Sequence, residues 1–152
     1  MTLTLPTAAD THAFGRRLAT ILRAGDLVLL TGPLGAGKTA LAQGIGAGLR
    51  VQGAVTSPTF VIARVHQGGR VPLVHVDAYR LGGVRDPLGE VDALDLDATL
   101  DESVTLVEWG EGLVERLTDE HLEVRIDRRD DESRVVDLVP SGGDWSARLA
   151  RL

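Results

Sequence analysis

Gly32-Pro-Leu-Gly-Ala-Gly-Lys-Thr39 is the stretch that decides the fold of this chain. It matches the pattern G-x-x-x-x-G-K-[ST], which is typical of loops that bind phosphate groups. The short apolar run Leu27–Thr31 before it indicates a buried strand, and Leu41, Ile45 and Leu49 recur at helical spacing after it. This order of strand, glycine-rich loop and helix predicts an α/β P-loop fold.

The residue types of the loop explain how it would hold a phosphate. Its glycines permit positive φ angles and let backbone N–H groups approach the anion, while the start of the following helix adds a partial positive charge. Lys38, the only lysine in the chain, should reach the β- and γ-phosphates, and Thr39 offers a hydroxyl to Mg²⁺. We therefore expect the nucleotide to lie against Gly32, Pro33, Leu34, Gly35, Ala36, Gly37, Lys38, Thr39 and Ala40.

Composition and charge limit the classes of function. A length of 152 residues predicts a single domain over residues 1–152, and the net charge of -6 argues against autonomous binding to nucleic acid or to an anionic membrane. The absence of cysteine excludes disulfides, thiolate catalysis and Cys-ligated zinc. The N-terminus lacks the features of a signal peptide and no apolar run is long enough to span a membrane, so we expect a cytoplasmic protein.

Two further strand-like runs end in carboxylates. Val71–Asp77 closes on Asp77, and Val104–Val107 is followed by Glu108. Open α/β sheets bind ligands beyond the carboxyl ends of their strands, where P-loop enzymes need one group to hold Mg²⁺ and one to orient the attacking water. Asp77 and Glu108 are the two candidates, and the spacing leaves their assignment open. His75 shares a strand face with Asp77, but a packed histidine is favoured over a metal pair.

The rest of the chain supplies turns, caps and periodic runs. Gly44, Gly46 and Gly48 either permit close packing of their helix or weaken its last turns. The acidic segment from Gly82 to Glu102 fits a solvated face or a docking surface for a basic partner. At the N-terminus we expect an edge strand at Thr2–Leu5, a capping box at Thr7–Asp10 and a helix that carries Phe14, Leu18, Ile21 and Leu22 and stops at Gly25. Two hairpins are expected, one of Phe60–His66 with Val71–Asp77 and one of Leu122–Ile126 with Arg134–Leu138. Further helices are expected near Leu88–Leu94, over Glu111–Leu117 and, capped by Asp144, at the end of the chain.

Ser57, Pro58 and Thr59 form a segment with two interpretations. Ser-Pro breaks a helix and indicates a plain turn or loop. The same hydroxyls would suit a switch-like loop that senses the γ-phosphate.

Four motifs in this order resemble the TsaE (YjeE) family. They are the loop Gly32–Thr39, Ser57–Phe60, His75-Val-Asp-Ala-Tyr-Arg-Leu81 and Leu106-Val-Glu-Trp109. The resemblance implies a P-loop fold with a mixed, mostly parallel sheet and hairpins. It also implies an ATPase that is nearly inert alone and docks on the proteins TsaD and TsaB, where ATP hydrolysis supports repeated modification of adenosine 37 in tRNAs that read codons starting with A.

The resemblance also implies roles for particular residues. Thr39 and Glu108 would hold Mg²⁺, Asp77 would lie near the γ-phosphate or the attacking water, and Trp109 would sit beside the nucleotide. Ser57 and Thr59 would belong to the switch-like loop. Three further candidates are Thr11 and Arg134 as flanking nucleotide contacts and Arg80 as the nearest arginine finger.

Two other classes of function remain as alternatives. A small-molecule kinase would use the same P-loop, although the chain is short for both an acceptor site and a closing lid. A nucleotide-state switch would bind partners without useful turnover. The guanine motif N-K-x-D is absent, which favours ATP over GTP.

Overall fold

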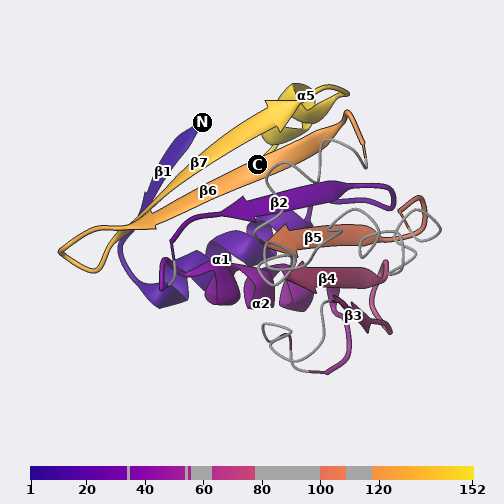
Figure 1. Cartoon of the computed structure of the whole chain (residues 1–152), viewed down its shortest axis with the longest axis horizontal. Helices are drawn as coiled ribbons and strands as arrows, with labels where there is room; N and C mark the ends of the chain where they lie inside the picture. Colours follow the sequence, from indigo (N-terminus) through magenta and orange to yellow (C-terminus); the bar gives the residue numbers. More distant parts are fainter. Residues whose placement is uncertain (34, 54, 56–62, 78–99, 109–117) are drawn as a thin grey trace, which may run out of the picture.

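The computed structural model describes residues 1–33, 35–53, 55, 63–77, 100–108 and 118–152 (Figure 1). In these residues the strands form one seven-stranded sheet in the order β1-β7-β6-β2-β5-β4-β3. The strands are β1 (Thr2–Leu5), β2 (Leu27–Thr31), β3 (Ala63–His66), β4 (Leu73–Asp77), β5 (Val104–Glu108), β6 (His121–Arg128) and β7 (Arg134–Ser141), and the helices are α1 (Ala8–Ala19), α2 (Lys38–Leu49) and α5 (Trp145–Leu149).

The sheet is mixed, with a parallel centre. Strands β6, β2, β5 and β4 run parallel to one another, whereas β7, β1 and β3 join them antiparallel. Every residue of β2 and β5 is buried, as expected for central strands whose two faces are covered. The expected α/β fold, the edge strand and the two hairpins are thereby confirmed, except that residues 60–62 of the first predicted hairpin lie outside the described residues.

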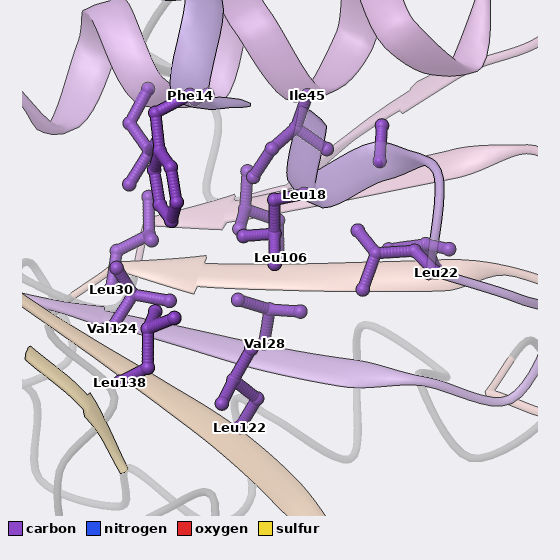
Figure 2. Close-up of a cluster of buried hydrophobic side chains, with 14 of the residues drawn as sticks. Phe14, Leu18, Leu22, Val28, Leu30, Ile45, Leu106, Leu122, Val124 and Leu138 are labelled. Atoms are coloured by element: carbon purple, nitrogen blue, oxygen red, sulfur yellow. The ribbon is translucent and has the colours of Figure 1, made fainter. Parts of the chain in front are cut away.

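Helices α1 and α2 pack together against one face of the sheet. Figure 2 shows Phe14, Leu18 and Ile45 directed from the helices toward side chains of the strands, Leu30 and Leu106 among them. The helices cross at Gly44, where a Cβ atom would lie 2.1 Å from the carbonyl oxygen of His12. The helical glycines therefore serve close packing.

The ends of α1 show one prediction confirmed and one wrong. Thr7 and Asp10 form the expected capping box. The helix ends at Ala19, before Leu22, although the periodicity predicts that it continues. Short-range hydrogen bonds such as Leu22 N–H to the Ala19 oxygen (3.2 Å) tighten the last turn. They keep Leu22 buried at 1% exposure without a continued helix.

Asp144 also departs from expectation. It precedes α5, but its side chain makes no capping hydrogen bond. Its carboxylate instead accepts a hydrogen bond from the guanidinium of Arg23 at 2.9 Å. The bond from Arg23 is favoured over a capping bond because a charged guanidinium is a stronger donor than a backbone amide. The helices expected near Leu88–Leu94 and over Glu111–Leu117 lie outside the described residues. Within the described part of the chain, no helix is long and apolar enough to cross a membrane.

Candidate functional site: a glycine-rich loop at the carboxyl edge of the sheet

The loop leaves the end of β2 and turns directly into α2. Gly32 has a φ of 151°, and a Cβ atom there would lie 2.1 Å from the backbone oxygen of Ile126. Gly35 and Gly37 also have positive φ angles, 79° and 111°. Only glycine satisfies both the conformation and the close approach at Gly32. Gly37 is the N-cap of α2, so the positive end of the helix dipole faces the loop.

Lys38 is held against the same loop. Lys38 is only 6% exposed, and its Nζ donates a hydrogen bond to the Gly32 oxygen at 2.6 Å. A buried ammonium carries a high desolvation cost. An anion placed at the loop would offset that cost, because the loop amides and the ammonium converge there.

The carboxyl ends of three parallel strands meet beside the loop. In the sheet register Asp77 pairs with Glu108, and Leu30 of β2 pairs with Glu108 on its other side. The backbone positions of Asp77 and Glu108 are thus adjacent, at the edge where Thr31 leads into the loop. The side chain of Asp77 lies outside the described residues, so its direction stays a prediction.

Glu108 forms a buried pair with His75. The Nε2 atom of His75 lies 2.7 Å from Oε2 of Glu108, and the two side chains are 0% and 4% exposed. His75 is therefore packed, as expected, but the sequence did not reveal that its partner is the candidate metal ligand. A carboxylate has four lone-pair positions, so this bond leaves oxygen capacity on Glu108 for a cation. Among the described residues, no cluster of three or more His, Asp or Glu side chains forms a protein-only metal site.

Arg134 and Thr11 lie beside the loop, although they are distant in sequence. A Cβ atom on Gly37 would be 3.5 Å from Nε of Arg134 and 3.7 Å from Cγ2 of Thr11. The Arg134 Nε is buried without a hydrogen-bond partner, while its Nη1 donates to the Glu132 oxygen at 2.6 Å. An unpaired guanidinium N–H next to an anion-binding loop is a ready donor for a bound nucleotide.

The other predicted site residues are divided by what the structure describes. Ala36 is buried, Thr39 is exposed at the start of α2, and Pro33 and Ala40 lie at the two ends of the loop. Those outside the described residues are Leu34, Ser57, Pro58, Thr59, Arg80 and Trp109.

Sequence reasoning missed a hollow beside the loop. It measures about 510 Å³ and takes its walls from the end of β2, from β6 and from β7. One wall carries Arg125, whose guanidinium lies 3.1 Å from Glu123; the hydrogen bond that Arg125 donates to Glu123 raises the pKa of Arg125. Thr31 donates to the same Glu123 carboxylate at 3.1 Å. Because the residues that line the hollow come from three separate segments of the chain, no local sequence motif could have predicted it.

The loop, its lysine and the parallel strands around them define a protein of the P-loop class, with the fold of nucleotide-binding proteins. The family profile of "Threonylcarbamoyl adenosine biosynthesis protein TsaE" matches residues 5–136. A Streptomyces coelicolor protein named tRNA threonylcarbamoyladenosine biosynthesis protein TsaE is 59% identical over 138 residues, which cover 87% of this chain and 91% of that relative. The Bacillus subtilis protein of the same name is 35% identical over 137 residues, covering 90% and 83%.

A solved structure agrees with these sequence comparisons. The crystal structure of Bacillus subtilis YdiB superposes with a TM-score of 0.81 at 27% identity, covering 99% of this chain and 92% of YdiB. The chain belongs to the TsaE family.

Proposed function

We propose that this protein is a Mg²⁺-dependent ATPase that serves the threonylcarbamoyladenosine modification of tRNA and works on the partner proteins TsaD and TsaB. The names of its relatives place them in that biosynthesis. The observation that carries the ATPase part is the convergence of the Lys38 loop with Glu108 at one edge of the sheet. Phosphate binding and a metal-holding carboxylate are two of the requirements of nucleotide hydrolysis, and the third is a group that orients the attacking water.

The chain's own groups divide the work. Loop amides and the α2 terminus bind the phosphates, and Lys38 neutralises charge between the β- and γ-phosphates. Thr39 and Glu108 would hold Mg²⁺, because a hydroxyl and a carboxylate supply the oxygen ligands that this ion prefers. When bound, the ion neutralises charge that builds up on the phosphate oxygens. Asp77 would orient the water that attacks the γ-phosphorus as the bond to the bridging oxygen breaks.

His75 acts in this proposal as a positioning residue. Its imidazole fixes the Glu108 carboxylate by the 2.7 Å contact, as second ligand shells commonly do for metal-binding carboxylates. Thr11 and Arg134 would contact the nucleotide beside Gly37. The segment of Ser57, Pro58 and Thr59 would complete the site as the switch-like loop, and Trp109 would lie beside the nucleotide.

The ATPase test compares hydrolysis by the protein alone with hydrolysis after TsaB, TsaD and tRNA are added. We expect a large rise on addition, and we expect Glu108→Ala to abolish it. Glu102→Ala is the matched control, since Glu102 is an exposed carboxylate that precedes the amino end of β5, at the opposite end of that strand from Glu108. A flat rate with intact nucleotide binding would refute the ATPase. Transfer of labelled γ-phosphate to a small molecule would replace it with a kinase.

Nucleotide affinity separates the roles within the site. Lys38→Ala should weaken ADP binding by roughly 10- to 100-fold, because a charge-assisted hydrogen bond contributes about 1.5–3 kcal/mol. Asp77→Ala should leave ADP affinity unchanged and lower hydrolysis, since ADP lacks the γ-phosphate. Isothermal titration calorimetry measures both affinities. A large loss of ADP affinity in Asp77→Ala would remove the water-orienting role.

A further inference from the structure

Two neighbouring hollows lie at the far end of the helix pair from the P-loop. The first, about 470 Å³, lies between α1 and the end of α2. The second, about 440 Å³, lies beyond the end of α1 and borders α5. Thr20 lines both, so the two hollows adjoin. Because α2 has 12 residues, this end is about 18 Å from the loop.

Arginine dominates the walls of both hollows. Seven of the chain's 16 basic residues line them, and neither is lined by an acidic side chain. This concentration is unexpected in a chain with a net charge of -6. We call these residues the arginine face; they are Arg16, Arg17, Arg23, Arg50, Arg70, Arg148 and Arg151.

Three members of the arginine face have structural partners. Arg70 donates to the Ala19 and Leu22 oxygens at 2.8 and 2.9 Å, which satisfies carbonyls at the end of α1. Arg148 forms a buried ion pair with Asp26, and Arg23 pairs with Asp144.

The other four arginines have no such role within the described part of the chain. No side-chain hydrogen bond or ion pair joins Arg16, Arg17, Arg50 or Arg151 to another described residue. Cations at a helix C-terminus gain roughly 0.3–1 kcal/mol each from the helix dipole. That gain explains why a cation lies in the last turn of a helix. It does not explain why these four arginines lie around the same two hollows as the three paired arginines.

Arg50 adds an independent observation. It has φ 62° and ψ 34°, the left-handed conformation, where it ends α2 through N–H contacts to the Ala47 and Gly46 oxygens. Glycine is the usual residue at such a helix end, and an L-residue there costs about 1–2 kcal/mol. A strained arginine in place of glycine points to a use for its side chain.

We infer that the arginine face, through its four members without structural partners, binds the phosphodiester backbone of a helical segment of RNA. Guanidinium groups match phosphate oxygens in a two-pronged geometry. Two adjoining hollows suit consecutive phosphates of one chain better than a single small anion. Neither hollow is lined by an aromatic side chain that could stack on a base, which favours backbone contacts on paired RNA over single-strand recognition. The RNA's identity as tRNA rests on the proposed function.

The test measures binding of an unmodified tRNA transcript by fluorescence anisotropy, at several salt concentrations and without ATP, TsaB or TsaD. The test variant combines Arg16→Gln, Arg17→Gln and Arg50→Gly, and Arg128→Gln is the control for loss of one exposed charge. We expect the triple variant to bind at least 10-fold more weakly near 100 mM salt. Its slope of log affinity against log salt should be shallower by about 2–3, since each lost phosphate contact removes about 0.7–0.9.

Folding is checked separately. Arg50→Gly should not lower the melting temperature, because glycine relieves the left-handed strain. Equal tRNA affinity in wild type and triple variant, or no binding by the wild type, would overturn the proposal. Loss of TsaB or TsaD binding with unchanged tRNA affinity would also overturn it and assign the face to a protein. Because ATP hydrolysis is not part of this assay, its failure leaves the ATPase test independent.

Discussion

The buried contact between His75 and Glu108 permits a double-mutant test of how the site is held. Leucine replaces each residue singly and then both together, and the free energy of unfolding is measured in urea without nucleotide or Mg²⁺. His75→Leu leaves a carboxyl group buried at 4% exposure without its imidazole partner. Glu108→Leu leaves the imidazole unpaired on its Nε2 side, while its Nδ1 already lacks a partner.

The expected magnitudes follow from that burial. An orphaned buried polar group costs about 1–3 kcal/mol, and more when it is charged. Replacing both partners by apolar groups removes the orphan, so the double variant should be less destabilised than the sum of the singles. Since hydrogen bonds to charged groups contribute about 1.5–3 kcal/mol, we expect a coupling energy in that range.

An additive result would refute the reasoning. If the double variant equals the sum of the singles within about 0.5 kcal/mol, His75 and Glu108 do not act as a pair. A functional readout completes the test: His75→Gln should raise the Mg²⁺ concentration that half-saturates ATP hydrolysis. If that concentration does not change, His75 has a structural role only.

Three further predictions concern stability. Gly44→Ala should cost about 1–3 kcal/mol by overpacking against the His12 oxygen, measured by urea unfolding; an unchanged midpoint would contradict the close crossing. Burial lowers the pKa of His66 in the folded protein, so folding favours its neutral form. The free energy of unfolding should therefore be highest above about pH 6.5, the pKa of an unperturbed histidine, and should fall as the pH drops below that value. His66→Leu should lack this pH dependence. Asp26→Asn should cost about 3–5 kcal/mol by removing the buried carboxylate that neutralises Arg148, since the other carboxylate near Arg148, that of Asp144, is half exposed and lies 3.8 Å away. A thermal melt that matches wild type would show the pair with Asp26 to be dispensable.

Much of the fold could be predicted because it depends on local patterns in the sequence. The run Leu27–Thr31 is apolar at every position but the last, which suits a strand covered on both faces. The Thr7–Asp10 capping box is a local hydrogen-bond device, so a few residues were enough to predict the start of α1. The alternation in β6 and β7 likewise predicted their hairpin. The end of α1 was predicted wrongly because the tightened turn keeps Leu22 on the apolar face that helical periodicity detects.

The site was predictable only in its local part. The spacing of the glycines predicted the loop, and the position of two carboxylates directly after apolar runs predicted that they lie at strand ends. That Asp77 and Glu108 are register partners depends on strand order, which periodicity does not encode. The contact between His75 and Glu108 spans 33 positions, and pairing across that distance requires β4 and β5 to be neighbours.

Charge was the quantity that the sequence represented least well. A net charge of -6 averages over the chain, while attraction to a phosphate backbone depends on cations within about one Debye length, roughly 10 Å at 0.1 M salt. The ends of α1 and α2 supply part of the arginine face, the β3–β4 turn supplies Arg70, and α5 supplies Arg148. Only the fold brings these segments together. The average charge therefore predicts weak binding to RNA over the whole surface, but it does not predict the salt dependence of binding at this face.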